Sequence, residues 1–145
     1  MKSHIAAILT LASFAAGAGQ TFTMDVKAYV PFDATTTVTV ECPDSTAADW
    51  LASHLKEWYG DYAPKVVSAN LSTSQLFNLS TSPEAYAASA DASGVKIAAN
   101  TLAGVRWASY TLRQLAIAKR GTVKTEGMIL PTLSITDAPH LAINV

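Results

Sequence analysis

The chain has 145 residues, of which 50% are hydrophobic and 14% are charged. A composition this apolar and this weakly charged excludes an intrinsically disordered chain and is typical of a globular domain. The 10 basic and 11 acidic residues give a formal net charge of −1 and form no basic stripe, so nucleic acid is not an expected partner.

The first 18 residues have the pattern of a secretory signal peptide. Lys2 supplies a positive charge, residues 5–16 form an apolar stretch, and Ala-Gly-Ala at positions 16–18 resembles a cleavage site. The alternative is a hydrophobic N-terminal helix of the fold. The apolar run is shorter than the ~18 residues that a membrane span needs, so no membrane anchor is expected. We therefore predict a secreted or periplasmic protein with one mature domain, residues 19–145.

The first part of this domain is expected to form a strand and a helix. Residues 21–34 show no clear period and predict an irregular lead-in, with a turn at Pro31 and Asp33. Residues 35–42 alternate Thr with Val or Cys, which predicts a strand with one buried face. A helix is expected from Ala47 to Gly60, after possible N-cap residues at positions 44–46. Its predicted apolar stripe consists of Ala47, Leu51, Leu55 and Trp58.

The second part predicts a hairpin, another helix and a final strand. A short strand is expected at residues 65–70, followed by a polar loop at 72–82. Residues 84–100 alternate on both sides of a turn at Asp91–Gly94, which is typical of a β-hairpin. Thr101 is the expected N-cap of a helix that carries Lys119 and Arg120 in its last turn and ends at Gly121. Residues 128–136 complete the fold as a strand.

These elements predict an α+β fold. Each helix has one apolar stripe and each strand mostly one apolar face, so the simplest arrangement is a two-layer sandwich. We expect a largely antiparallel sheet with both helices packed on one face. Gly104, near the start of the second helix, would allow that helix to approach the sheet closely.

The chemistry-bearing side chains are scattered along the chain. Cys42 alternates with two valines and is expected in the core; the alternative is a reactive thiol activated by His54. His54 and His140 alone cannot hold a metal, because zinc takes three or four protein ligands. Glu57 and Asp61 are expected to be a surface pair, and no phosphate-binding loop occurs. We therefore predict no catalytic residues, no metal and no cofactor.

Four aromatic residues stand out as candidate contact residues: Trp50, Trp58, Trp107 and Tyr110. Trp107 and Tyr110 lie three residues apart and off the main apolar stripe of the second helix. They can pack against a loop or another domain, which is the interpretation we favour, since helically spaced aromatics often mark an interface. The alternative is a platform for a sugar ring, because a pyranose has an apolar face.

The second half of the chain resembles a known family. Residues 86–100, the segment Thr-Leu-Ala-Gly at 101–104 and Tyr-Thr-Leu-Arg-Gln-Leu at 110–115 resemble the N-terminal domain of family 20 glycoside hydrolases, the β-N-acetylhexosaminidases. Residues 129–139, Ile-Leu-Pro-Thr-Leu-Ser-Ile-Thr-Asp-Ala-Pro, resemble the segment that leads into the catalytic barrel. Asp137 would fix the turn at that junction. Departures follow at once, because Asn144 stands where the family has a sugar-binding Arg.

The resemblance implies a domain without catalytic machinery of its own. In that family an adjacent Asp-Glu pair in the following barrel acts on the substrate. This sequence contains no Asp-Glu dipeptide, and only six residues follow Pro139, whereas such a barrel takes ~250 residues. We expect an accessory domain whose partner is a catalytic barrel or a glycan. The alternatives are a free-standing exported module that binds a glycan, or one that binds another exported protein.

Overall fold

The computed structural model describes residues 21–70, 82–119 and 127–138. The predicted signal peptide, most of the predicted polar loop at 72–82, and the end of the chain with His140 and Asn144 lie outside these residues. Within them, neither helix is long and apolar enough to cross a membrane.

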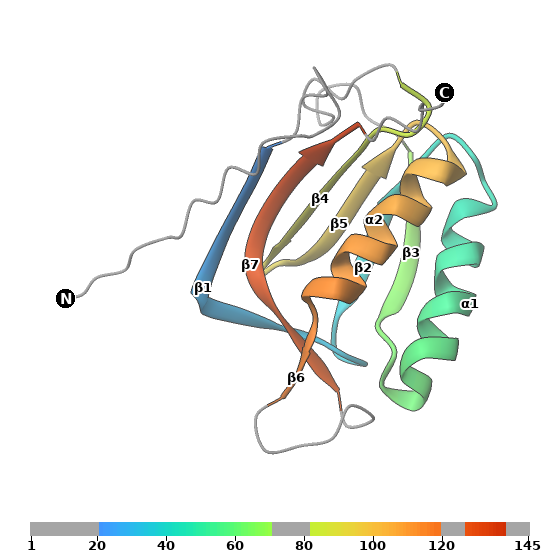
Figure 1. Ribbon diagram of the computed structural model, residues 1–145. Helices are drawn as coiled ribbons and strands as arrows, with labels where there is room; N and C mark the ends of the chain where they lie inside the picture. The colour runs from blue at the N-terminus through green and yellow to red at the C-terminus, as the bar shows by residue number, and fades with distance from the viewer. Residues whose placement is uncertain (1–20, 71–81, 120–126, 139–145) are drawn as a thin grey trace.

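The described residues form one mixed sheet and two helices (Figure 1). The strands are β1 (Thr21–Phe32), β2 (Thr37–Glu41), β3 (Lys65–Ala69), β4 (Tyr86–Asp91), β5 (Gly94–Ala99), β6 (Ile117–Ala118) and β7 (Met128–Asp137), and the helices are α1 (Ala47–Tyr59) and α2 (Leu102–Leu115), with a short 3-10 turn at Gly60–Tyr62. The strand order is β1-β7-β4-β5-β2-β3, and β6 pairs with β7. Strand β2 is parallel to β3 and β5, and the other pairs are antiparallel. The predicted α+β class is confirmed.

Helix α1 connects the parallel strands β2 and β3. Its N-cap residue, Thr46, makes no side-chain cap and instead donates its hydroxyl to Asp44 Oδ1 at 2.6 Å. Gly60 follows the helix with φ of 60°, a value that costs glycine little. The predicted stripe packs on the core: Ala47, Leu51 and Leu55 are buried, Trp58 is half-buried against the core, and Tyr59, which the prediction did not include, is buried as well.

Strand β1 corrects the prediction of an irregular lead-in. Residues 21–32 pair antiparallel with β7 along most of their length. The pairing is interrupted between Asp25 and Tyr29, where the three residues 26–28 of β1 have no paired residue in β7, because Asp25 pairs with Thr132 and Tyr29 with the adjacent Pro131. Phe22 and Phe32 are buried on either side of this irregularity, but the exposed residues between them hide the period of two. The predicted turn at Asp33 is confirmed, since Thr36 N donates to Asp33 O at 2.8 Å.

The end of α2 corrects a second prediction. The helix ends at Leu115 and does not reach Lys119, because Ala116 is already extended, with ψ of 135°; the predicted end at Arg120 and Gly121 lies outside the described residues. Strand β6 follows at once and pairs Ile117 with Ile129 of β7. Pairing with β7 therefore replaces the last turn of helix that the sequence favoured.

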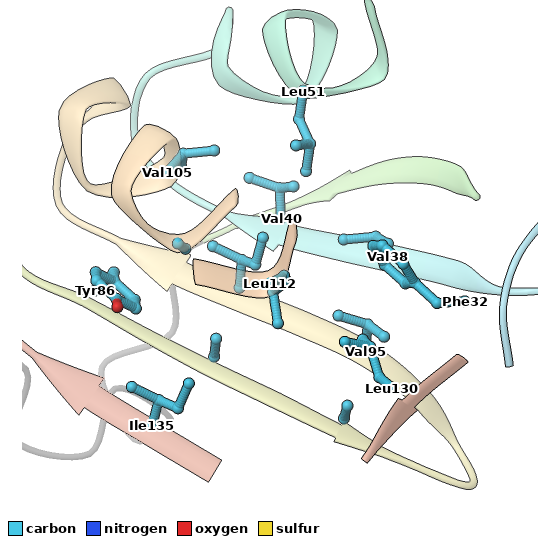
Figure 2. Close-up of a cluster of buried hydrophobic side chains, with 14 of the residues drawn as sticks. Phe32, Val38, Val40, Leu51, Tyr86, Val95, Val105, Leu112, Leu130 and Ile135 are labelled. Atoms are coloured by element: carbon cyan, nitrogen blue, oxygen red, sulfur yellow. The ribbon is translucent and has the colours of Figure 1, made fainter. Parts of the chain in front are cut away.

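One hydrophobic core lies between the helices and the sheet (Figure 2). Leu51 from α1 and Val105 and Leu112 from α2 are buried with residues from β2, β4, β5 and β7. Both helices therefore cover the same face of the sheet, as predicted. The fully buried large side chains are Phe32, Val38, Val40, Leu51, Tyr86, Ile97, Val105, Leu130 and Ile135.

Candidate functional site

The acidic side chains of the described residues serve separate local roles. Asp44 and Asp91 each accept hydrogen bonds from the residue two positions on, Thr46 and Ser93, and so fix turns. These hydrogen bonds lower the pKa of both carboxyls, as expected for acceptors that bind as anions. The described residues bring no three of His, Cys, Asp and Glu together as a possible metal site. Glu57 is exposed, in keeping with a surface role.

The sheet face opposite the helices carries a hollow of about 320 Å³. The strand registers place Ala87, Ala98 and Thr136 in one row across β4, β5 and β7, with Ser89, Lys96 and Ser134 in the next row. Small side chains therefore create the hollow. Its lining contains one lysine and no carboxylate, so it offers no pair of acids for glycoside cleavage.

Cys42 and His54 belong to different environments. Cys42 is 8% exposed and belongs to the hydrophobic core, as the strand alternation predicted. Burial raises the pKa of its thiol, which disfavours the reactive thiolate. The His54 ring instead contacts Trp50 and Trp58 on its own helix. These contacts favour the core interpretation of Cys42.

The most distinctive surface of the described residues joins the two helices, and its two tryptophans also pack against the edge of the core. Residues 50, 54 and 58 recur every four positions on α1, and residues 106, 110 and 113 share one side of α2. We call this set the aromatic–arginine surface; it consists of Trp50, His54, Trp58, Arg106, Tyr110 and Arg113. Trp50 approaches Arg106 and Tyr110, whereas Trp58 approaches Tyr110 and Arg113, so the two helices run in the same direction.

Ring stacking and cation–π contacts organise this surface. His54 stacks on Trp50 with ring centroids 4.0 Å apart, and its Nδ1 donates to the Trp50 carbonyl oxygen at 2.9 Å. The Arg106 guanidinium lies 5.6 Å from the Trp50 centroid, and that of Arg113 lies 4.5 Å from the Trp58 centroid. Both distances fall within the ~6 Å range of a cation–π interaction. Side chains of the protein itself therefore already lie over both tryptophan rings.

The structure separates the two predicted contact residues, Trp107 and Tyr110. Trp107 is half-buried against the core, and its Nε1 donates to Glu84 Oε1, just before β4. Tyr110 is 42% exposed and contacts Trp50 and Trp58 from α1. The two side chains therefore have different surroundings, and a contact with a sugar or a partner stays a prediction for both.

Sequence reasoning missed three members of the aromatic–arginine surface: His54, Arg106 and Arg113. The spacing of residues 50, 54 and 58 was a usable signal for one side, because i, i+4 residues are neighbours on a helix. The two arginines had no comparable signal, since an exposed arginine on a helix is ordinary. Only the packing of α2 beside α1 brings them over tryptophan rings.

The last strand ends in a polar region near the start of β4. The Tyr86 hydroxyl lies 2.8 Å from Thr111 Oγ1, and burial raises the pKa of Tyr86 to about 12. Asp137, which the family resemblance places at the junction with the barrel, is half-buried. Burial raises the pKa of its carboxyl despite a hydrogen bond from the backbone of Ala138. Asp137 is the last residue of β7 and pairs with Tyr86, the first residue of β4.

Comparisons with known proteins agree with this architecture. Among curated proteins, none matches the chain. Of the solved structures, an exo β-N-acetylglucosaminidase from Vibrio harveyi has 22% identity and a TM-score of 0.51 over 78% of this chain and 17% of its own. A β-N-acetylhexosaminidase from Streptomyces coelicolor has 23% identity and a TM-score of 0.53 over 78% of this chain and 24% of its own. A chitobiase from Flavobacterium johnsoniae has 16% identity and a TM-score of 0.53 over 82% of this chain and 20% of its own.

These three likenesses show the fold, and this chain spans no more than about a quarter of each of those proteins. The family itself comes from a sequence profile described as glycosyl hydrolase family 20, domain 2, which matches residues 20–138. The match covers both helices and every strand of the sheet. The chain therefore belongs to the family of glycosyl hydrolase family 20, domain 2, the accessory domain of the family 20 hexosaminidases.

Proposed function

We propose that this chain is a non-catalytic accessory domain that packs against the catalytic barrel of a β-N-acetylhexosaminidase-like protein and stabilises it. The observation that carries the proposal is the family match across residues 20–138 together with the dispersed carboxylates of the described residues. A glycosidase needs either two converging carboxyl groups or a carboxyl group beside a substrate that supplies its own nucleophile. Neither the sheet hollow nor the aromatic–arginine surface offers such a group.

The matched region of the three relatives supports the same role. It makes up 17% to 24% of those chains, so at least three-quarters of each protein lies outside it. Two of the three are named for removing N-acetylhexosamines. A domain that recurs beside a larger enzyme part and lacks paired acids is suited to a supporting function.

The test is an activity assay on the purified chain with a chromogenic N-acetylglucosaminide. We expect no release of the chromophore, while the Streptomyces coelicolor enzyme, assayed in parallel, gives full turnover. Turnover by this chain that survives repeated purification would contradict the proposal. Because residues 1–18 resemble a signal peptide, we also propose export to the periplasm or the medium. N-terminal sequencing of the exported protein should then start at Gly19.

The exposed ring of Tyr110 favours a second candidate function, a glycan-binding module. An aromatic ring that is 42% exposed can stack on the apolar face of a sugar. Trp107 would contribute less, since its indole is half-buried and already bonded to Glu84. Binding on a glycan array that Tyr110→Ala abolishes would establish this function, and an array without signal would remove it.

A further inference from the structure

The sheet face away from the helices carries a second hollow beside the one described above. It has a volume of about 370 Å³ and is lined by residues of β1, β4 and β7. The two hollows share Ser89 and Ser134, so they form one shallow trough over β5, β4, β7 and β1, which we call the sheet trough. Each hollow lies near the lower end of the roughly 300–1,000 Å³ of small-molecule sites, so the trough has room for a ligand of about two rings.

The sheet trough is lined mainly by hydroxyl groups. Ser89, Ser134 and Thr136 line the first hollow, and Thr23 and Thr132 line the second. Within the part of the chain that the structure describes, the hydroxyls of the first three make no hydrogen bond. A hydroxyl both donates and accepts, so this lining suits a ligand whose own groups do the same. The trough therefore favours a polyhydroxyl ligand over an apolar one.

A charged pair lies at the β5 end of the sheet trough. Lys96 lines the first hollow with 43% of its side chain exposed, and its Nζ lies 3.7 Å from Glu41 Oε2. Glu41 belongs to the neighbouring strand β2, where it pairs with Ala98 of the same hollow. Because the carboxylate offsets the charge of the ammonium group, an anion gains little attraction there. The pair instead offers one donor and one acceptor side by side to a neutral ligand.

The acceptor of this pair is not fully used by the protein. Glu41 is 7% exposed, and its Oε1 is buried without a hydrogen-bond partner among the described residues. An unsatisfied buried acceptor destabilises a fold, so stability does not explain this carboxylate. The terminal torsion of a glutamate is broad, and its rotation would present Oε1 to a hydroxyl group at this end of the trough.

We propose that the sheet trough binds a neutral disaccharide of pyranose rings, and that Lys96 and Glu41 hold two adjacent hydroxyls of one ring. One sugar hydroxyl accepts a hydrogen bond from Lys96 Nζ, and its neighbour donates one to Glu41 Oε1. Ser89 and Ser134 bind the middle of the disaccharide, where the two hollows meet. An extended peptide is a poorer occupant, because it binds a sheet at a strand edge and not on the face.

This site is separate from the proposed accessory role and from the exposed ring of Tyr110. Tyr110 lies on α2, and α2 covers the other face of the sheet (Figure 1). Sugar binding at the trough and sugar binding at Tyr110 are therefore distinguished by substitutions on opposite faces. The activity assay given above tests the accessory role and does not depend on this site.

The test is isothermal titration calorimetry of the purified chain with two probes, N,N′-diacetylchitobiose and cellobiose. The variants are Ser134→Ile, Glu41→Gln and Tyr110→Ala. Ser134 is exposed and lines both hollows, so an isoleucine there fills the middle of the trough. Ser68→Ile, the same change at an exposed position of β3 that lines neither hollow, is the matched control. Thermal unfolding followed by circular dichroism checks that each variant is folded.

We expect at least one probe to bind with a dissociation constant in the millimolar range, since a few hydrogen bonds in an open trough give low affinity. Ser134→Ile should abolish binding, and Glu41→Gln should weaken it about tenfold, the effect of one lost hydrogen bond to a charged group. Tyr110→Ala and Ser68→Ile should leave the affinity unchanged. If the unsubstituted chain binds neither probe, the proposal is overturned. Binding that survives Ser134→Ile in a folded variant, or that Tyr110→Ala abolishes, would also overturn it, and the second result would assign the sugar to the helices.

Discussion

The α-carbon of Gly104 lies against the backbone carbonyl oxygen of Ala85, the residue before β4. A methyl group at position 104 would overlap that oxygen and would lie 2.8 Å from the β-carbon of Ala99. Thr101, the N-cap of α2, lies three residues before Gly104, and its hydroxyl accepts a hydrogen bond from Gly104 N at 3.4 Å. The same hydroxyl donates a hydrogen bond to Pro83 O at 2.5 Å. The first turn of α2 is thus held against the start of β4 and the end of β5.

Gly104→Ala should therefore destabilise the domain. In an exposed helix the same change would stabilise by about 1 kcal/mol, because alanine is the better helix former. Here the overlap with the Ala85 carbonyl forces α2 away from the sheet, and we expect a net loss of about 2 kcal/mol, within the range for overpacked cores. Urea unfolding followed by circular dichroism measures the change. Ala52→Gly on the exposed side of α1 is the control for propensity alone. A more stable Gly104→Ala variant would show that α2 can shift freely.

Tyr86 should make the domain sensitive to alkaline pH. Burial raises the pKa of its hydroxyl from 10.0 to about 12, although the hydrogen bond with Thr111 opposes the shift. The folded state therefore holds the proton more tightly than the unfolded state. This contribution to stability is complete below pH 10 and is lost between about pH 10 and 12, to a total of up to about 3 kcal/mol.

The measurement is the free energy of unfolding of Tyr86→Phe and of the unsubstituted chain between pH 7 and 11.5. At pH 7 the variant should lose about 1 kcal/mol, the usual value of one hydrogen bond. Above pH 10 the difference should shrink and then reverse, since the variant has no buried hydroxyl to ionise. Tyr29→Phe, at a position 42% exposed, is the control. Parallel pH curves for Tyr86→Phe and the unsubstituted chain would contradict this prediction.

Asp33 should contribute stability that acid removes. Burial by itself would raise the pKa of this carboxyl, but the Thr35 hydroxyl and backbone N–H, at 2.6 and 2.8 Å, and Lys119, at 3.6 Å, lower it overall. A lowered pKa in the folded state stabilises the fold above the unfolded value of 3.8, and this stabilisation is lost as pH falls through the folded value.

Asp33→Asn should cost about 1.5–3 kcal/mol at pH 7, the range for hydrogen bonds to a charged group. The cost should shrink below pH 4, where the carboxyl of the unsubstituted chain becomes protonated. Chemical unfolding at pH 7, 5 and 3 provides the comparison, with Glu57→Gln at an exposed position as the control. An equal cost at pH 3 and pH 7 would show that the charge of Asp33 does not matter.

Removing Lys96 should destabilise the domain more than removing Glu41, its partner in an ion pair. Glu41 is 7% exposed, its Oε2 lies 3.7 Å from Lys96 Nζ, and its Oε1 is buried without a hydrogen-bond partner among the described residues. Lys96→Met leaves a buried carboxylate uncompensated and should cost about 1–3 kcal/mol. Glu41→Met removes the buried charge and should be neutral or stabilising.

Thermal and urea unfolding of both variants and of the double variant tests this asymmetry. Lys65→Met, at an exposed position of β3, is the control for the loss of a surface lysine. The double variant should regain the stability that Lys96→Met loses. If Glu41→Met destabilises the domain as much as Lys96→Met does, the pair is stabilising as a whole and the prediction is wrong.

Local signals explain which elements the sequence predicted well. The hairpin of β4 and β5 was clear because alternation flanks a turn whose glycine, Gly94, has φ of 127°. The N-cap at Thr101 and the end of α1 at Gly60 were equally local. Cys42 was placed in the core because it follows two buried valines at a spacing of two.

The errors arise where a distant strand decides the local structure. Strand β1 carries an irregularity that hides its period, and only its pairing with β7 shows that it is a strand. Ile117 is in a strand and not in the helix because it pairs with Ile129 of β7. Local helix or strand propensity does not predict a pairing with a residue that is distant in the sequence.

By itself, the sequence determined the class of the domain, both helices, the hairpin and the family resemblance, because these depend on residues close together in the chain. The tertiary structure decided that Trp107 bonds to Glu84 whereas Tyr110 joins Trp50 and Trp58. It also decided that Arg106 and Arg113 lie over tryptophan rings. The physical reason is that the direction and depth at which one helix packs beside another depend on contacts with the whole sheet, and no spacing within one helix encodes them.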